Sequence, residues 1–322
     1  MNAFEYVNPS NLKDVPQLLS QKRDRKSVVM AGGIDLLGEL KDNLIAPNRL
    51  VNIKALDLRY IRHGKDGVRI GATTTLSDVA SDADVVKMYT ALSEAAASVA
   101  SLQIRNVGTI GGNLCQRPRC WYYRGEEFHC LKKGGHKCFA VDGENKYHAI
   151  MGGGPCHIVH PSDTAPALIA LQATIKIQGP TGERTVPASE FFVLPMENLY
   201  QETVLLPNEV VTEVFVPKPK SGSKSTYLKF KEKGYMDFAL SAAAVALRVE
   251  GGVCREAQVV LGGVAPKPWQ VDASSLVGQA LTEERVVAFA NRALKDAEPL
   301  RDNAFKVTLS KTMVKRGVMA LV

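Results

Sequence analysis

Ala31-Gly32-Gly33-Ile34-Asp35-Leu36-Leu37 is the stretch that decides the fold. It follows an apolar segment, Ser27–Met30, that predicts a strand, and a helical pattern resumes through Leu40. Glycines lack a Cβ atom, so successive backbone N–H groups can converge on an anion, and a helix that starts just afterwards adds its positive dipole end. The sequence therefore predicts a strand, a glycine turn and a helix that together suit a phosphate.

A second glycine turn, Thr109-Ile110-Gly111-Gly112-Asn113, has the same character. Two such loops suit the two phosphates of a dinucleotide. The common dinucleotide fingerprint G-x-G-x-x-G and the P-loop pattern are both missing from the chain. A bound nucleotide is therefore expected on a different scaffold.

The composition indicates a globular protein of more than one domain. The chain has 322 residues, of which 45% are hydrophobic and 23% charged. Its net charge of +7 is dispersed and forms no aromatic-interleaved basic stripe, which argues against nucleic-acid binding. No apolar run reaches the roughly 18 residues that span a bilayer, and the N-terminus lacks the pattern of a secretory signal. We expect a cytoplasmic protein; export with a partner that carries a twin-arginine signal stays open.

Further elements follow from periodicity and turn residues. The patterns predict strands at Leu50–Ile53, Val68–Gly71, Ala242–Val249 and Val253–Leu261, and helices at Tyr89–Ser101 and Ala304–Val322. The last two strands flank Gly251-Gly252 and predict an antiparallel hairpin. Thr282 is predicted to cap a helix, and Pro217–Lys224 is predicted to be a linker.

Five of the six cysteines fall between Cys115 and Cys156. In a chain without a secretory signal, grouped thiols are better explained as metal ligands than as disulfides, and thiolates suit an iron–sulfur cluster or zinc. Histidines crowd the same segment, so zinc remains an alternative. Structural zinc sites commonly have paired C-x₂₋₄-C knuckles, whereas 9, 7 and 17 residues separate the last four cysteines of this segment, and this irregular spacing favours a cluster. Cys115 and Cys254 are interpreted as packed side chains.

In chain order, AGGIDLL, GATTTL, TIGGNL, HPSD and YLKFKEKGYMDFAL resemble the flavin-binding medium subunit of the xanthine dehydrogenase and molybdenum hydroxylase family. The resemblance spans nearly the whole chain. It implies an α+β fold: a vanillyl-alcohol-oxidase (PCMH-type) FAD-binding fold in two subdomains, residues 1–55 and 56–218, and a C-terminal antiparallel sheet-and-helix domain, residues 225–322.

The resemblance also implies which residues hold FAD. They are Ala31, Gly32, Gly33, Ile34, Asp35, Thr109, Gly111, Gly112, Asn113, Ser162, Asp163 and Lys229. The first loop would bind the pyrophosphate, and the second would complete the cradle towards the flavin. Ser162 and Asp163 would hold the ribityl or phosphate region, and Lys229 would approach the flavin. The alternatives are that Asp163 only caps a helix starting at Ala165 and that Lys229 is a solvated strand residue.

Residues 115–157 resemble an insertion found in the subset of this family whose flavin subunit carries a [4Fe–4S] cluster, such as bacterial aromatic aldehyde oxidoreductases and 4-hydroxybenzoyl-CoA reductases. On that pattern the ligands are Cys120, Cys130, Cys138 and Cys156. The aromatic residues beside the first ligands, Trp121, Tyr122, Tyr123 and Phe128, are expected to pack around the site.

The function implied by the resemblance is that of an oxidoreductase subunit with no catalytic residue assigned on this chain. It would pass electrons through FAD between [2Fe–2S] centres of a small partner subunit and an external acceptor, beside a molybdopterin-binding large subunit, in a heterotrimer or its dimer. The alternatives are a 4-hydroxybenzoyl-CoA-reductase-like subunit with reverse electron flow, a stand-alone flavin oxidase or reductase, and a zinc-stabilised binding module.

Overall fold

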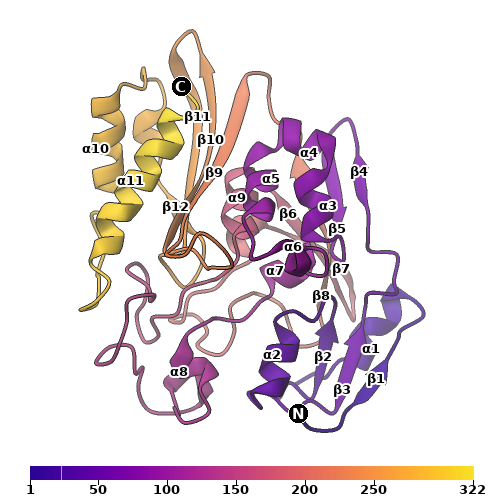
Figure 1. The fold of residues 1–322 in the computed structure, drawn as a ribbon. Helices are drawn as coiled ribbons and strands as arrows, with labels where there is room; N and C mark the ends of the chain where they lie inside the picture. The colour runs from indigo at the N-terminus through magenta and orange to yellow at the C-terminus, as the bar shows by residue number, and fades with distance from the viewer. Residues whose placement is uncertain (23) are drawn as a thin grey trace.

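The computed structural model describes residues 1–22 and 24–322, which form three β-sheets with helices between and beside them (Figure 1). The strands are β1 (Glu5–Val7), β2 (Ser27–Met30), β3 (Arg49–Asn52), β4 (Ile61–His63), β5 (Gly67–Gly71), β6 (Thr174–Gly179), β7 (Gly182–Pro187), β8 (Val210–Pro217), β9 (Ser223–Phe230), β10 (Ser241–Glu250), β11 (Val253–Gly262) and β12 (Trp269–Val271). The α-helices are α1 (Val15–Leu18), α2 (Leu36–Lys41), α3 (Leu76–Ser81), α4 (Ala83–Met88), α5 (Thr90–Ala97), α6 (Leu102–Arg105), α7 (Ile110–Leu114), α8 (Trp121–Arg124), α9 (Thr164–Ala170), α10 (Glu283–Ala293) and α11 (Phe305–Met319).

The three sheets follow one another along the chain. The first is parallel, in the order β1-β3-β2. The second is antiparallel, in the order β4-β5-β8-β6-β7. The third is antiparallel, in the order β12-β11-β10-β9. The α+β class and the C-terminal antiparallel sheet are therefore confirmed.

The first sheet places the glycine turn at a sheet edge where ligands commonly bind. β1 and β2 both pair with β3 in parallel, so their carboxyl ends meet at one edge. β2 ends at Met30 and α2 begins at Leu36, which leaves residues 31–35 as the predicted strand-to-helix turn. In folds of this kind a ligand lies outside the carboxyl ends of the strands.

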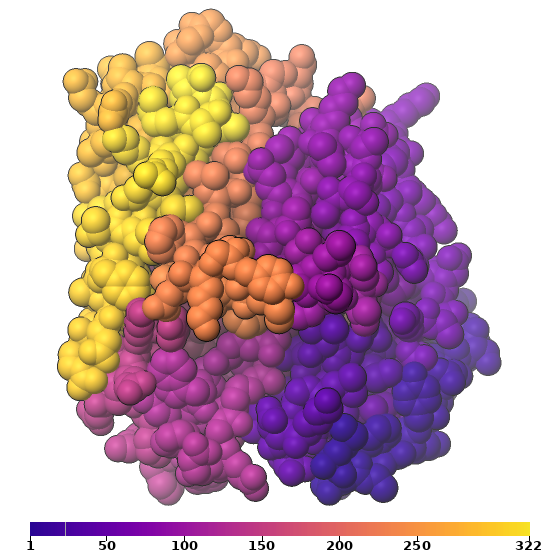
Figure 2. Space-filling view, viewed as in Figure 1, coloured from indigo at the N-terminus to yellow at the C-terminus, as the bar shows by residue number. Residues whose placement is uncertain are grey.

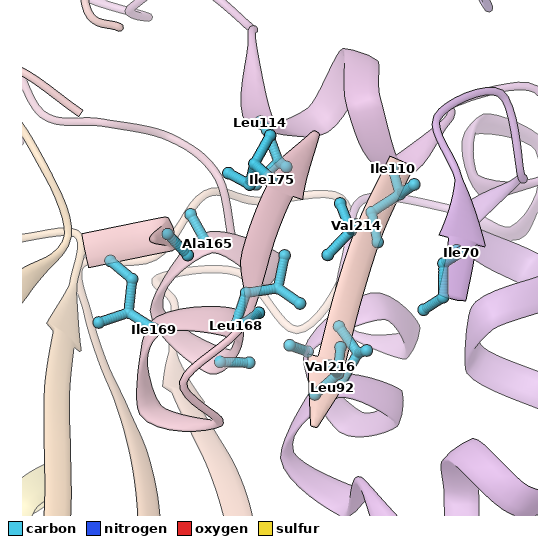
Figure 3. Close-up of a cluster of buried hydrophobic side chains, with 14 of the residues drawn as sticks. Ile70, Leu92, Ile110, Leu114, Ala165, Leu168, Ile169, Ile175, Val214 and Val216 are labelled. Carbon is cyan, nitrogen blue, oxygen red and sulfur yellow. The ribbon is translucent and has the colours of Figure 1, made fainter. Parts of the chain in front are cut away.

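The main hydrophobic core lies between the second sheet and helices α5, α7 and α9 (Figure 3). Ile175 of β6 and Val214 of β8 are fully buried in it with Leu92, Ile110 and Leu168 of the helices. Burying a side chain of this size stabilises a fold by about 1.5–3 kcal/mol. This packing fixes α7, and with it the second glycine turn, against the sheet.

The third sheet carries helices on both faces. α11 packs against β9 and β10, while α5 and α9 contact the same sheet from the side of the main core. The predicted β10–β11 hairpin is confirmed, and both of its turn glycines have left-handed backbone, with φ of 57° at Gly251 and 77° at Gly252. Thr282 caps α10 as predicted, because its hydroxyl accepts from the backbone N–H of Arg285.

Two predicted elements are shorter in the structure. The helix expected over Tyr89–Ser101 is α5, which ends at Ala97. Its end is fixed by Lys229, whose Nζ donates to the Ser98 carbonyl, and by Ala100, which has left-handed backbone at φ 39°. The linker expected over Pro217–Lys224 shrinks to residues 218–222, because the strands on both sides extend into it.

The cysteine-containing segment, residues 115–157, forms a lobe with little regular structure besides α8 and a 3-10 turn, η2 (Leu131–Lys133). In Figure 2 its magenta atoms lie between the indigo N-terminal part and the yellow C-terminal helix. It has its own small core around Tyr122, Tyr123 and Ala140. The lobe therefore contacts both ends of the chain.

The predicted domain boundaries fall between the sheets. β3 ends at Asn52 and β4 begins at Ile61, and the second and third sheets are separated by residues 218–222. The independence of the ranges 1–55, 56–218 and 225–322 stays a prediction. Among residues 1–22 and 24–322, no helix combines the length and the apolarity needed to cross a bilayer.

Candidate functional site

A cleft of about 630 Å³ brings together segments from all three parts of the chain. A volume of this size is typical of ligand pockets. Of the residues predicted to hold FAD, the cleft is lined by Ala31, Gly32, Gly33, Ile34, Asp35, Thr109, Gly111, Gly112, Asn113, Asp163 and Lys229. Ser162 is buried behind this wall and does not line the cleft.

The first glycine turn offers a run of free backbone donors. Within the described residues, the N–H groups of Gly32, Gly33, Ile34 and Asp35 donate to no protein acceptor. Gly33 has left-handed backbone at φ 73°, and a Cβ on Gly32 would lie 2.1 Å from the Val107 carbonyl oxygen. These two positions therefore require glycine, and the resulting concave row of N–H groups suits an anion.

The second glycine turn has a different role from the one predicted by analogy with the first. Its N–H groups are already bound: Gly111 to the Ala72 carbonyl at 3.0 Å, Gly112 to the Thr109 hydroxyl at 3.1 Å, and Asn113 to the Thr109 carbonyl at 2.8 Å. The bonds of Gly112 and Asn113 cap and continue α7, and the bond of Gly111 ties the turn to Ala72. The turn therefore shapes the wall of the cleft, and its backbone is not free to bind phosphate.

Asn113 is the polar side chain that this turn presents to the cleft. Its Oδ1 accepts hydrogen bonds from the hydroxyls of Ser162 and Thr164, both at 2.6 Å. The Ser162 hydroxyl also accepts from the Ala165 backbone N–H, so its proton points to Asn113 and sets the orientation of the amide. Ser162 thus positions Asn113, whose nitrogen has no protein acceptor among the described residues.

Asp163 and Lys229 form a buried ion pair in the wall of the cleft. Asp163 Oδ2 accepts from Lys229 Nζ at 2.8 Å, and its Oδ1 accepts from the Tyr227 hydroxyl at 2.7 Å. Both members of the pair have about 5% of their side chains exposed. Burial raises the pKa of Asp163, and Lys229 opposes that rise.

Both alternatives for this pair are wrong. Asp163 is the residue before α9, but its side chain makes no capping hydrogen bond. Lys229 is not solvated, because its ammonium also donates to the Ser98 carbonyl at 3.1 Å. The pair joins the second part of the chain to strand β9 of the third.

The Asp35 carboxylate holds the cysteine lobe. It accepts from the backbone N–H of Arg117 at 2.6 Å and pairs with Arg124 at 2.8 Å and Arg119 at 3.0 Å. The carboxylate is thus engaged with the lobe, while the backbone N–H of Asp35 donates to no protein acceptor among the described residues. The sequence contained the acid and the arginines but gave no signal that they meet.

Two buried glutamates extend this link and were missed in the sequence. Glu39 of α2 accepts from Arg25 at 2.7 Å and from the Tyr123 hydroxyl at 3.0 Å. Glu202 pairs with Arg117 at 2.9 Å and with Lys132 at 2.6 Å. Through these carboxylates, the wall of the cleft is tied to residues beside Cys120 and Cys130.

The four predicted ligand cysteines, Cys120, Cys130, Cys138 and Cys156, line one small internal cavity. None of the cysteines in the described chain forms a disulfide. The Cys156 thiol faces the Cys138 sulfur, and this hydrogen bond lowers the pKa of Cys138 and raises that of Cys156. Burial raises the pKa of Cys120 to about 12.

Four thiols suit two kinds of metal centre. Among residues 1–22 and 24–322, no three His, Cys, Asp or Glu side chains are placed as ligands around a metal ion. Zinc binds its sulfurs about 2.3 Å from one ion, whereas in a [4Fe–4S] cluster each thiolate binds a different iron. The donor chemistry of the four thiols fits a cluster and also fits zinc.

Of the aromatic residues expected to pack around the site, Tyr122 and Tyr123 line this cavity, and Trp121 and Phe128 pack against the small core of the lobe. Trp121 and Tyr122 each pack edge-on against a neighbour, Tyr147 and Phe128 respectively. His148 lies 5.3 Å from Trp121 between ring centroids, and its Nε2 lies 3.2 Å from Cys120 Sγ. Apolar rings beside a metal centre limit its contact with water, which affects its potential.

The remaining cysteines are packed side chains. Cys115 lines the cleft, packs against the main core, and has its pKa raised to about 12 by burial. Cys254 is a fully buried residue of strand β11 in the third sheet. Neither lines the cavity of the other four.

Two family models match the chain. One, described as the FAD binding domain in molybdopterin dehydrogenase, matches residues 2–219, and the other, the CO dehydrogenase flavoprotein C-terminal domain, matches residues 225–321. The aldehyde oxidoreductase FAD-binding subunit of Escherichia coli is 33% identical over 97% of this chain and 96% of its own length. The carbon monoxide dehydrogenase medium chain of Hydrogenophaga pseudoflava is 32% identical over 98% and 96%.

Solved structures agree with these matches. The carbon monoxide dehydrogenase of Hydrogenophaga pseudoflava superposes with a TM-score of 0.79 and 30% identity, over 99% of this chain and 97% of that one. The quinoline 2-oxidoreductase of Pseudomonas putida gives 0.75 and 25%, with the same coverage. The similarity thus extends over all three sheets.

Proposed function

Because the chain belongs to the family of FAD-binding subunits of molybdenum hydroxylases, we propose that it is the electron-transfer subunit of such an enzyme and carries both FAD and a [4Fe–4S] cluster. It would pass electrons between [2Fe–2S] centres on a partner subunit and an external acceptor. The observation that carries this proposal is that one cleft collects the predicted flavin residues while one adjoining lobe collects the four cysteines.

The cleft offers a dinucleotide two kinds of contact, namely backbone N–H groups from the first glycine turn and polar side chains from the other segments. The free N–H groups of residues 32–35 would hold the pyrophosphate, since a concave row of donors matches anionic oxygens. Asn113 Nδ2 would donate to the cofactor from the opposite loop. Lys229 brings a positive charge to the cleft wall, held in place by Asp163.

Bound FAD would supply the exchange between two-electron and one-electron carriers. The chain's own part is binding, orientation and electrostatics. The apolar wall formed by Leu19, Val28 and Ile53 excludes water from one side of the cleft. Lys229 would favour negative charge at the wall that it lines, because its ammonium is buried and cannot move away.

The cluster is supported by the chemistry of the cavity, while the relatives' names specify only the flavin. Four thiols converge in a lobe with an aromatic wall, without any disulfide among the described residues. Cys120 and Cys130 are each next to an anchored segment, through Arg117 and Lys132 respectively. This anchoring would hold the ligands at fixed positions relative to the cleft.

The proposed partner subunits are inferred from relatives that are named as medium chains of larger enzymes. We propose a molybdopterin-binding large subunit and a [2Fe–2S] small subunit, in a heterotrimer or its dimer, with electrons flowing from substrate oxidation towards this chain. Co-purification with affinity-tagged chain tests this point. Recovery of the chain without either partner under native expression would contradict it.

The cofactor content of the full chain, purified without oxygen, tests the central proposal. We expect FAD together with about four iron and four acid-labile sulfide per chain. Cys130→Ser should lose the iron and keep the FAD, because Cys130 lies outside the cleft. Cys254→Ser is the matched control, since Cys254 is equally buried but far from the cavity, and it should keep both. Iron retained in full by Cys130→Ser would refute the assignment of the ligands.

A further inference from the structure

Lys306 is a buried lysine without a carboxylate partner. It sits in the first turn of α11 with none of its surface exposed, and within the described chain it forms no salt bridge. Its Nζ donates instead to the backbone carbonyls of His148 at 2.9 Å and Gly263 at 2.6 Å. Burial lowers the pKa of Lys306 to about 7, which reflects the cost of a cation held in a dry place.

The same turn of the C-terminal domain holds the segment 145–149 of the cysteine lobe. Asn303 is fully buried, and its Nδ2 donates to the carbonyls of Asn145 and His148, both at 3.2 Å. The backbone N–H of Asp302 donates to Asn145 Oδ1 at 2.8 Å. This segment is therefore fixed from one side by several hydrogen bonds to residues 302–306.

On its other side, the segment presents the His148 ring to the cysteine cavity. His148 lines that cavity, and its Nε2 lies 3.2 Å from Cys120 Sγ. A ligating thiolate can only accept a hydrogen bond, so the ring would donate its Nε2–H to Cys120.

We infer that Lys306 and His148 set the reduction potential of the metal centre held by the four cysteines, with Lys306 as a positioning residue supplied by the C-terminal domain. This inference rests on the proposed cluster. Four thiolates outweigh the positive charge of a [4Fe–4S] core, and reduction adds one more negative charge. A buried cation and a hydrogen bond to sulfur both stabilise the reduced form and so raise the potential.

The arrangement also explains why a lysine is buried without a counter-ion. A charge removed from water is costly unless an opposite charge compensates it. The carbonyl oxygens supply part of that compensation through hydrogen bonds, and the negatively charged centre beyond His148 supplies the rest. The lysine is thus matched to a charge that the protein chain itself does not carry.

The test is a redox titration of the full chain at pH 6, below the pKa of Lys306, with the reduced cluster followed by electron paramagnetic resonance. Lys306→Gln keeps a hydrogen-bond donor and removes the charge, and Lys306→Met removes both. We expect both variants to shift the one-electron equilibrium towards the oxidised form about tenfold, which corresponds to about 59 mV. Lys311→Gln, on the same helix but without an ion-pair partner among the described residues, should leave the potential unchanged.

The outcomes separate the inference from the cluster proposal. Absence of iron from the unmodified chain would overturn the cluster, whereas full iron content with an unchanged potential in both Lys306 variants would overturn only this inference. His148→Phe keeps the aromatic packing and removes the N–H donor. If the Lys306 variants lose their iron, the potential of this variant tests the inference instead. A potential lowered in His148→Phe supports the inference, and an unchanged one refutes it.

Discussion

At the scale of single residues, the cleft depends on positions where only one side chain is compatible with the backbone. Gly33 adopts left-handed backbone beside the free N–H groups, and a Cβ atom at Gly32 would clash with the Val107 carbonyl oxygen. Asn113 is oriented by a serine that itself never reaches the cleft. The ligand-binding surface is therefore set by backbone conformation and by hydrogen bonds made behind it.

Gly33→Ala should weaken FAD binding about tenfold, because left-handed backbone costs a residue with a Cβ roughly 1–2 kcal/mol. The dissociation constant can be measured by quenching of flavin fluorescence. Gly251→Ala is the matched control, since Gly251 is also left-handed but lies in the β10–β11 turn with open space around it. Equal affinities in the two variants would contradict the role of the first turn.

His160 should make the fold sensitive to acid. Burial lowers its pKa to about 3, whereas an unfolded histidine has a pKa near 6.5. Between these values the unfolded chain binds the extra proton, so stability is lost as the pH falls. We expect a loss of about 2 kcal/mol from this residue between pH 6.5 and pH 5.

Denaturant unfolding of the chain at several pH values measures this loss. His160→Asn keeps an acceptor for the backbone N–H of Ser162, which donates to His160 Nδ1 at 3.3 Å, but removes the titration. Its stability should therefore change less with pH than that of the unmodified chain. The same pH slope in both proteins would exclude His160 as the cause.

At the scale of elements, α2 connects the cleft to the cysteine lobe. Asp35 precedes the helix and Glu39 lies within it, and both carboxylates bind residues of the lobe. Burial would raise the pKa of Glu39, but Arg25 and the arginines of the lobe together lower it. Helix α2, which directly follows the first glycine turn, therefore also fixes the start of the lobe.

Asp35→Asn should loosen residues 117–124 and weaken FAD binding together. The loss of charge-assisted hydrogen bonds to Arg119 and Arg124 costs about 1.5–3 kcal/mol. Hydrogen exchange measured by mass spectrometry should show faster exchange in that segment. Asp42→Asn at the exposed end of α2 should leave exchange and affinity unchanged, and an effect of equal size there would contradict the link.

At the scale of the whole molecule, the cleft is closed by contacts between parts that are distant in sequence. Asp163 and Tyr227 lie 64 residues apart, and Asp163 and Lys229 lie 66 apart. α5 and α9 lie between the second and third sheets and keep these parts together. The third sheet thus contributes Lys229 to the wall of the cleft.

Lys229→Met should destabilise the protein by about 3–5 kcal/mol, because it leaves Asp163 buried without its cation. Asp163→Asn with Lys229→Met should cost less than the sum of the single changes, since neither partner is left charged and alone. Thermal unfolding of all four proteins gives the coupling between the two residues. Additive losses would show that the pair does not act as a unit.

The sequence by itself determined the local features: the glycine turns, the β10–β11 hairpin and the four cysteines in one segment. These follow from rules that act over a few residues, such as backbone freedom at glycine and the period of apolar side chains. The tertiary structure alone decided which groups remain free and which are paired. The Asp35 carboxylate pairs with arginines more than 80 residues away, and the N–H groups of the second turn donate to Thr109 and to the distant Ala72 carbonyl. Such pairings depend on which distant segments the packed core brings into contact, and no short stretch of sequence contains that information.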